Sequence, residues 1–401
     1  MLGKLGALIK NCIKKVILLG YHLCIKIFPV CKDIILLESN LGRNYTGNPR
    51  AIYEEMVRQG LDKKYRCYFI LEDTSTNIPG AAKKVKRTRF KYFFLFARAG
   101  IWISDSRFPM YIIKRPNCHY IQTWHGTPLK KLALDMDTVF MAGESGIDIY
   151  KKNFYNNAQT WDYLLSQNRY SSEIFRRAFG FEKDIIEIGY PRNDVLFQKN
   201  NAKDIRKLKL QLGLPLDKKI ILYAPTWRDN EFYGQGKYKF NPPLDFAKMQ
   251  EEMGQDYCMI VKCHYLVMDQ IDWSPYQGFI YSYDLSYDIA SLYLVSDLMI
   301  TDYSSVMFDY NILQRPMFFY CYDLEEYKDT LRGFYFDFLE EAPGPVVLTT
   351  KDLIKAIKQY DPEVFAEKQK AFTRKYNHVD DGNASKRVIE LIEVLHHGSD
   401  T

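Results

Sequence analysis

The stretch QTWHGTPLK, residues 122–130, directly follows the apolar run 118–122 and ends in residues that favour turns. The apolar run predicts a buried strand, and the glycine and proline after it predict the loop where that strand stops. Open α/β sheets place their ligand sites outside the carboxyl ends of their strands. We therefore expect His125 at such a strand end. There it is either a general base near neutral pH or a buried, hydrogen-bonded structural histidine.

Strand and helix patterns alternate on both sides of this loop. The predicted strands are 33–37, 68–71, 101–104, 118–122, 161–166 and 185–188 in the first half, and 219–223, 257–262, 279–281, 298–301 and 317–319 in the second. The predicted helices are 49–59, 89–99, 171–178, 202–212, 244–253, 287–294, 304–313 and a helical segment over 361–396. This alternation predicts parallel sheets with helices on both faces. Two doubly wound domains that face an interdomain cleft form the GT-B architecture, and this is the fold we expect.

The domain boundaries follow from a polar, lysine-rich break over 191–218. At 401 residues with an apolar fraction of 47%, the chain is long enough for two packed cores. We expect an amphipathic segment at 1–30, Rossmann-like domains at 31–200 and 201–370, and a C-terminal helix at 371–401 that packs back across both domains.

Composition excludes several classes of protein. A net charge of +6 is too mild for a dedicated nucleic-acid binder. The eight cysteines are scattered without metal-binding spacing, which favours a reducing, cytosolic environment. The chain also lacks the glycine fingerprints of dinucleotide-binding and P-loop proteins.

The N-terminus is basic and apolar, and no acidic residue precedes Asp33. On a helix over 1–30, one side holds Lys4, Lys10, Lys14 and Lys15, and the other holds Leu2, Leu5, Ile9, Cys12, Ile13 and Val16. This pattern is typical of a helix that lies on an anionic membrane surface, and the alternative is a helix docked on its own domain. The longest uncharged run, 16–25, is too short to span a bilayer. The basic, aromatic segment 86–98 fits a second membrane contact and a core helix equally well.

Two loops at strand ends in the second half carry polar groups suited to an anionic ligand. The first offers Thr226 and Arg228, although Arg228 could instead pair with Asp229 on the surface. The second places Lys262 and His264 directly after a strand. A protonated His264 can neutralise phosphate charge, and the alternative is a satisfied core histidine.

A third strand end, at 301, leads through Asp302 into a helix that starts near Ser304 or Ser305. Backbone N–H groups and hydroxyls at a helix start bind phosphate, and the alternative is a serine that only caps the helix. Asp309, within that helix, faces either the pocket or water. Two histidines and a hydroxylated helix start on separate strand ends indicate phosphoryl transfer, in which catalysis is mostly positioning and charge stabilisation. We expect no cofactor and no metal, because histidines and a helix dipole can take the metal's place.

Several motifs together resemble the CDP-glycerol glycerophosphotransferase family of teichoic acid synthesis. They are TWHGTPLKK (123–131), WDYLLSQN (161–168), GYPRND (189–194), YAPTWRD (223–229), CHY (263–265), SDLMITDYSSVMFDY (296–310) and RGFYFD (332–337). The resemblance covers about 35–390, and it is closest to the short transferases of the family. It implies a GT-B fold, an acceptor domain followed by a CDP-polyol donor domain, and peripheral association with the cytoplasmic face of the cell membrane.

The resemblance also implies a reaction and roles for individual residues. Glycerol phosphate passes from CDP-glycerol to a hydroxyl of a polyprenyl-diphosphate-linked teichoic acid precursor, with release of CMP. His125 matches the family's general base, and His264 matches a histidine on the donor diphosphate. Ser304 and Ser305 hold the same phosphates. Further substrate-binding candidates are Gly126, Thr127, Thr226, Arg228, Lys262, Asp302 and Asp309.

Other functions stay open at this point. Ribitol-phosphate transfer from CDP-ribitol uses the same motifs. A GT-B glycosyltransferase would need a hexose pocket, and a membrane scaffold would tolerate loss of both histidines. The expected partners are the CDP-polyol donor, the lipid-linked acceptor and an anionic membrane surface, with no nucleic acid. A homo-oligomer is left open.

Overall fold

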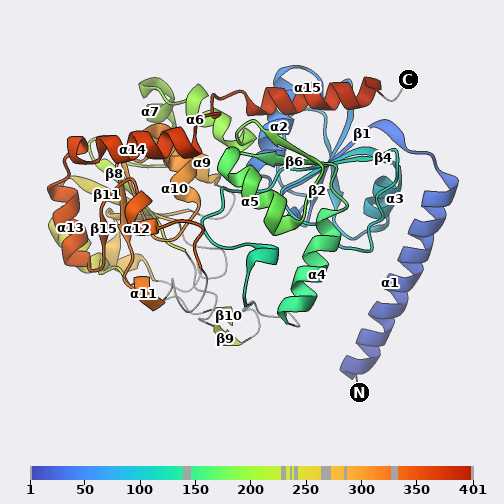
Figure 1. Ribbon diagram of the computed structural model, residues 1–401, viewed down its shortest axis with the longest axis horizontal. Helices are drawn as coiled ribbons and strands as arrows, with labels where there is room; N and C mark the ends of the chain where they lie inside the picture. Colours follow the sequence, from blue (N-terminus) through green and yellow to red (C-terminus); the bar gives the residue numbers. More distant parts are fainter. Residues whose placement is uncertain are drawn as a thin grey trace.

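Two parallel sheets organise the chain, one in each half of the sequence (Figure 1). The computed structural model describes residues 2–138, 146–226, 232–234, 237–238, 243–262, 272–283, 287–326 and 333–398, with side chains of the helix and strand residues 2–14, 232–234 and 237–238 left aside. His264 and Arg228 lie outside the described residues.

The first sheet has seven parallel strands in the order β3-β2-β1-β4-β5-β6-β7. Its strands are β1 (Cys31–Glu38), β2 (Arg66–Leu71), β3 (Lys83–Lys86), β4 (Ala99–Ser104), β5 (His119–Gln122), β6 (Tyr163–Ser166) and β7 (Asp184–Glu187). Strand order reverses between β1 and β4, and parallel α/β sheets bind ligands at such a switch point. Residues from α3 (Phe90–Arg98), α4 (Ile147–Ala158) and α5 (Arg169–Phe179) pack on one face, and α2 (Gly47–Arg58) packs on the other.

The second sheet has six parallel strands in the order β12-β11-β8-β13-β14-β15. Its strands are β8 (Lys219–Ala224), β11 (Tyr257–Val261), β12 (Ile280–Ser282), β13 (Leu298–Thr301), β14 (Met317–Tyr320) and β15 (Val346–Val347). The associated helices are α6 (Asp194–Gln198), α7 (Ala202–Gln211), α8 (Phe246–Met253), α9 (Ile289–Val295), α10 (Val306–Tyr310), α11 (Leu324–Glu326), α12 (Phe338–Glu341) and α13 (Thr350–Lys358). A short antiparallel pair, β9 (Phe232–Gly234) and β10 (Lys237–Tyr238), lies beyond β8 in the chain.

The C-terminal helices divide between the two domains. Helix α14 (Pro362–Tyr376) packs Phe372 and Tyr376 into the core of the second domain, and α15 (Ala384–His397) packs Val388 and Ile392 into that of the first. The chain therefore crosses back over the molecule between these helices, along one side in Figure 1. The crossing is anchored by Asp194, whose carboxylate accepts from Ala384 N (2.9 Å) and Ser385 N (2.8 Å) at the start of α15.

Helix α1 (Leu2–Ile27) lies at the edge of the first domain, with its N-terminal end pointing away from the body (Figure 1). Its inner face is held by Tyr21, which is buried against Phe93 of α3. The hydroxyl of Tyr21 also bonds to the backbone of Ile113 at 3.0 and 3.2 Å. No helix within the described ranges is both long enough and apolar enough to cross a membrane.

The architecture of two parallel α/β domains predicted from the sequence is confirmed, and individual elements differ. Strand β3 escaped prediction because three of its four residues are lysine, which suits an exposed sheet edge but hides the apolar pattern. The helical prediction over 361–396 is broken at 377–383, where the chain crosses between domains. Of the two alternatives left open for segment 86–98, the structure favours the core helix, because α3 buries most of its aromatic side chains.

The cap on α15 predicts a measurable loss of stability. Asp194→Ala leaves two N–H groups at the helix start without their acceptors, which costs about 1–2 kcal/mol. Thermal unfolding followed by circular dichroism should show the melting temperature fall by about 2–8 °C. Asp184→Ala, at the exposed start of β7, is the control and should leave the melting temperature unchanged. Equal melting temperatures for both variants would show that the cap contributes nothing.

Candidate functional site

The candidate site is a cleft of about 190 Å³ that both domains line. The first domain contributes Trp124, His125, Gly126, Thr127, Pro128, Leu129, Lys130 and Leu132, and the second contributes Thr226, Tyr303, Ser304 and Ser305. The structure thus brings together the loop after β5, the loop after β8 and the loop after β13. These are three of the four strand ends at which the sequence placed candidate residues; the fourth, after β11, carries Lys262 and His264.

The loop after β5 makes a sharp turn at Trp124, which has a left-handed φ of +50°. Such a conformation is costly for a bulky residue and needs support from its surroundings. Gln122 Oε1 accepts from Trp124 N at 2.9 Å, and the buried Asn48 donates to the carbonyls of Thr123 (3.2 Å) and Trp124 (3.0 Å). The turn therefore presents the next residue, His125, to the cleft.

His125 is oriented by two contacts. Its Nδ1 lies 2.9 Å from the carbonyl oxygen of Asp105, just past the end of β4. Because a carbonyl only accepts, Nδ1 carries the proton and Nε2 keeps its lone pair in the neutral ring. The Trp124 indole stacks on the imidazole, with ring centroids 4.5 Å apart. Although His125 is exposed to the cleft, its tautomer and ring plane are both set, as a general base requires.

Charged groups around His125 act on its basicity. Desolvation by the surrounding protein lowers the pKa of His125 below its usual range, and the guanidiniums of Arg192 and Arg107 add to this effect. The Asp105 carboxylate opposes it. That carboxylate is buried and accepts from Asn40 N (2.7 Å) and Ser106 Oγ (2.8 Å). A lowered pKa keeps the imidazole neutral near pH 7.

The second domain meets this loop at the start of α10. A Cβ built on Gly126 would lie 2.9 Å from Ser305 Oγ and 3.3 Å from Ser305 Cβ, so glycine permits this close approach. Ser305 stands at the N-cap position but its side chain makes no capping hydrogen bond. Ser304 Oγ lies 3.5 Å from Val306 N, a long contact. Neither hydroxyl is used as a strong helix cap.

The other predicted residues take varied positions. Asp302 is buried and accepts from Thr226 N at 2.7 Å, which joins the loops after β8 and β13. The Thr127 hydroxyl is buried and donates to Gln167 Oε1 at 2.5 Å, although the residue lines the cleft. Lys262 reaches the carbonyl of Tyr287 at 3.3 Å and does not line the cleft.

Asp309 faces neither the pocket nor water. It is buried between the domains, where Oδ2 accepts from Arg192 Nη2 (2.5 Å) and Oδ1 accepts from Asn193 Nδ2 (2.8 Å). Burial raises the pKa of Asp309, and the Arg192 guanidinium opposes the rise. Both carboxylate oxygens are thus held by the first domain.

Sequence reasoning missed Asp105 and Arg192 as parts of the site. Asp105 directly follows a buried strand, so the strand-end rule that selected the other residues would also have selected it. Arg192 lies within the motif GYPRND, to which no role was assigned. Nothing in the local sequence shows that its guanidinium reaches the second domain.

The two domains also exchange contacts beside the cleft. Leu129, from the loop after β5, packs into the core of the second domain, and Tyr335 packs against that of the first. Tyr335 N donates to the Leu129 carbonyl (2.9 Å), and Lys131 N donates to the Gly333 carbonyl (3.0 Å). Residues 333–335 of the motif RGFYFD therefore extend along the loop that carries His125.

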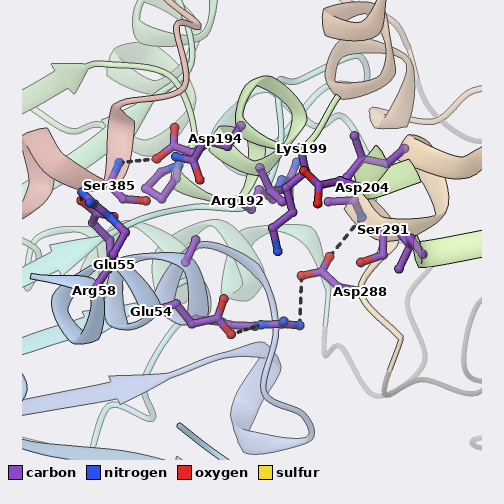
Figure 2. A pocket seen from close by; sticks show the side chains of 18 of the residues that line it. Glu54, Glu55, Arg58, Arg192, Asp194, Lys199, Asp204, Asp288, Ser291 and Ser385 are labelled. Carbon is purple, nitrogen blue, oxygen red and sulfur yellow. Dashed lines mark hydrogen bonds and ion pairs between the residues drawn. The ribbon is translucent and has the colours of Figure 1, made fainter. Parts of the chain in front are cut away.

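A larger groove of about 540 Å³ lies between α2, α7 and α9 (Figure 2). Acidic and basic side chains alternate on its walls. Arg50 bridges Glu54 (2.8 Å) of its own helix and Asp288 (3.4 Å) of the second domain. Arg192 lines this groove and donates to the His125 carbonyl, whereas the described residues that line the candidate cleft lie outside the groove.

Comparison with known proteins identifies the family of this chain. A model described as CDP-Glycerol:Poly(glycerophosphate) glycerophosphotransferase matches residues 21–394. The teichoic acid poly(glycerol phosphate) polymerase of Bacillus subtilis (strain 168) is 46% identical over 373 residues, which are 91% of this chain and 49% of that protein. The chain thus spans about half the length of that relative. The teichoic acid glycerol-phosphate transferase of Staphylococcus aureus (strain NCTC 8325 / PS 47) is 40% identical, over 96% of this chain and 100% of that protein.

The solved structures agree with the sequence comparisons. A structure of the wall teichoic acid polymerase TagF is 41% identical, with a TM-score of 0.90 over 98% of this chain and 96% of that one. A similar structure is of a histidine variant of TagF with CDPG. Relatives described as ribitol-phosphate polymerases are more distant, at 29% identity. The chain belongs to the CDP-glycerol:poly(glycerophosphate) glycerophosphotransferase family.

Proposed function

We propose that this protein transfers glycerol phosphate from CDP-glycerol to a hydroxyl of a polyprenyl-diphosphate-linked teichoic acid precursor and releases CMP. The observation that carries the proposal is the composite cleft. It holds an oriented imidazole from one domain and the two serines at the start of α10 from the other. Family membership and the CDPG structure of a relative support CDP-glycerol as the donor. The higher identity to glycerol-phosphate enzymes favours glycerol over ribitol.

In the proposed mechanism, His125 Nε2 takes the proton from the acceptor hydroxyl. The acceptor oxygen attacks the β-phosphorus and forms the new P–O bond, while the bond from that phosphorus to the bridging oxygen breaks and CMP leaves. Ser304 and Ser305 donate hydrogen bonds to the phosphate oxygens, whose charge must be held in the transition state. His264 and Arg228, assigned from the motifs alone, contact the donor diphosphate.

The remaining candidates divide by what the structure leaves them to do. Gly126 keeps the two walls of the cleft close together. We propose that Asp302 holds the loop of Thr226 against the donor, because it accepts from Thr226 N. The polar atoms of Thr127 and Asp309 are bound by other protein groups, so we propose that these residues stabilise the loops of the site. Lys262 does not line the cleft, and we propose that it lies at the edge of the donor-binding site.

A donor comparison tests the reaction itself. Purified protein with a lipid-linked acceptor should release CMP from CDP-glycerol, also in the presence of EDTA, and the lipid product should gain the mass of glycerol phosphate. CDP-ribitol in a parallel reaction is the control for the polyol. Release of CMP from CDP-ribitol alone would reassign the donor. If neither donor yields CMP, the proposal is contradicted.

The pH dependence tests His125 as the base. Since the pKa of His125 is lowered, the neutral imidazole persists to lower pH, and kcat/KM should fall only as pH drops through a midpoint below about 6.5. His125→Ala should lose turnover by a factor of about 10²–10⁴ while donor binding persists. His397→Ala, an exposed histidine on α15, should retain full activity. An acid limb unchanged by removal of His125 would exclude it as the base.

We also propose that α1 holds the protein on the cytoplasmic face of the cell membrane. Its outer face carries exposed Val16, Leu19, Leu23 and Ile27, spaced so that they form one stripe. Phe90 at the start of α3 is also exposed, at 66%. One side of the helix is thus docked on its own domain, while the other presents apolar side chains in a basic segment. Such a surface suits the interface of an anionic bilayer.

Charge in the apolar stripe should release the protein from lipid. Leu19→Glu/Leu23→Glu should sediment less with vesicles that contain phosphatidylglycerol, and added salt should weaken binding of the unchanged protein by screening its lysines. Val364→Glu is the matched control, because Val364 on α14 is 68% exposed and Leu19 is 63% exposed. If Leu19→Glu/Leu23→Glu sediments with the vesicles as much as Val364→Glu does, α1 is not the membrane contact.

A further inference from the structure

Arg192 joins the two halves of the cleft through one guanidinium. Its Nη1 donates to the carbonyl of His125 at 2.6 Å, and its Nη2 donates to Asp309 Oδ2 at 2.5 Å. His125 belongs to the loop after β5, whereas Asp309 belongs to α10, the helix that Ser304 and Ser305 precede. The backbone of the candidate base and the phosphate-binding helix therefore share one rigid, planar group.

The first domain anchors the Arg192 backbone and places an aromatic ring against the guanidinium. Arg192 N donates to Asn48 Oδ1 at 3.1 Å, and the same Asn48 amide donates to the carbonyls of Thr123 and Trp124. The Tyr190 ring lies under the guanidinium, with its centroid 5.2 Å from Cζ. The side chains of Arg192 and Asp309 are only 15% and 4% exposed. A buried, charge-assisted contact of this kind has a defined geometry and is little screened by salt.

The position of Asp309 explains what the contact controls. A displacement of α10 would carry Ser305 with it, and Ser305 already approaches Gly126 closely. The bond between Arg192 and Asp309 therefore sets the separation between His125 and the two serines. A second interdomain pair, Arg50 with Asp288 at 3.4 Å, lies in the groove of Figure 2 and does not involve the His125 loop.

We infer that Arg192 is a positioning residue, which Asp309 holds in place, and that it aligns His125 with the phosphate-binding serines across the two domains. The inference deepens the proposed function and rests on it for its catalytic consequence. Arg192 does not itself touch the reacting atoms in this account. Its effect is exerted through the His125 backbone and through its charge beside the imidazole.

The charge gives the inference a specific signature. Among the residues that the structure describes, the charged groups that act on His125 are Asp105 beyond β4, Arg107 in the same loop and Arg192 of the first domain. Lys130 also lines the cleft, and the second domain contributes the neutral hydroxyls of Ser304 and Ser305. Loss of the guanidinium in Arg192→Gln should raise the pKa of His125. Loss of the neutralising carboxylate in Asp309→Asn should lower it. Opposite shifts cannot arise if both variants only loosen the fold.

The decisive experiment is an NMR titration of the His125 imidazole, with its signal assigned by its absence in His125→Gln. The pKa of His125 should be about one unit lower in Asp309→Asn than in the unchanged protein, and about one unit higher in Arg192→Gln. The double variant should return toward the unchanged protein. Arg50→Gln is the matched control and should leave the titration unchanged. This readout needs no substrate, so it tests the inference even if the proposed reaction is wrong.

Kinetics then separate position from charge. Arg192→Lys keeps the positive charge but cannot donate to both partners as a planar fork. Its kcat should fall about 10- to 100-fold, with KM for CDP-glycerol little changed and the acid limb of the pH profile in place. Shifts of the His125 pKa in the same direction for Arg192→Gln and Asp309→Asn, or a fully active Arg192→Lys, would overturn the inference. If the unchanged protein releases no CMP from CDP-glycerol, that result would instead count against the proposed function.

Discussion

The buried ion pair between Arg192 and Asp309 is the constraint on which the composite site depends. Each domain has its own sheet and its own core, and neither contains both an oriented imidazole and the paired serines. Removal of one partner from a buried pair typically costs about 3–5 kcal/mol, because it leaves a charge uncompensated. The position of this pair matters as much as its strength. It joins the carbonyl of His125 to the helix that follows Ser304 and Ser305, and so it fixes two of the strand-end loops of the cleft relative to each other.

The chemistry of the cleft follows from how little freedom its groups retain. The Asp105 carbonyl selects the tautomer of His125, and the Trp124 ring sets its plane. Gly126 allows Ser305 to approach, and Asp302 ties the loop after β8 to the loop after β13. Catalysis of phosphoryl transfer depends mainly on alignment of the reacting groups and on hydrogen-bond donors directed at the charge that develops in the transition state. Fixed loops that meet at the ends of two parallel sheets supply both. We propose that the exposed stripe on α1 keeps this cleft beside a lipid-linked acceptor.

Much of this arrangement could be predicted from the sequence, because strand ends are a local property. The apolar runs before His125 and before Asp302 correctly placed both loops at the carboxyl ends of parallel strands. What the sequence could not supply was the pairing of polar groups across the domains. Asp309 was expected to face a pocket or water, yet Arg192, distant in the chain, covers it. Thr127 likewise binds Gln167 through a contact that no local pattern shows. Strand β3 was missed for a different reason, since its lysines suit an exposed edge and carry no apolar signal.

In the proposed mechanism the donor diphosphate lies between His125 and the serines before α10, and a structure with the donor bound tests this most directly. A crystal of the His125→Gln variant with CDP-glycerol should show the β-phosphate within hydrogen-bond distance of the Ser304 or Ser305 hydroxyl. The side chain that replaces the imidazole should lie on the opposite side of the phosphorus, and Arg192 should still hold Asp309. A donor bound in the groove beside Arg50 and Asp288, with its phosphates away from α10, would contradict the account.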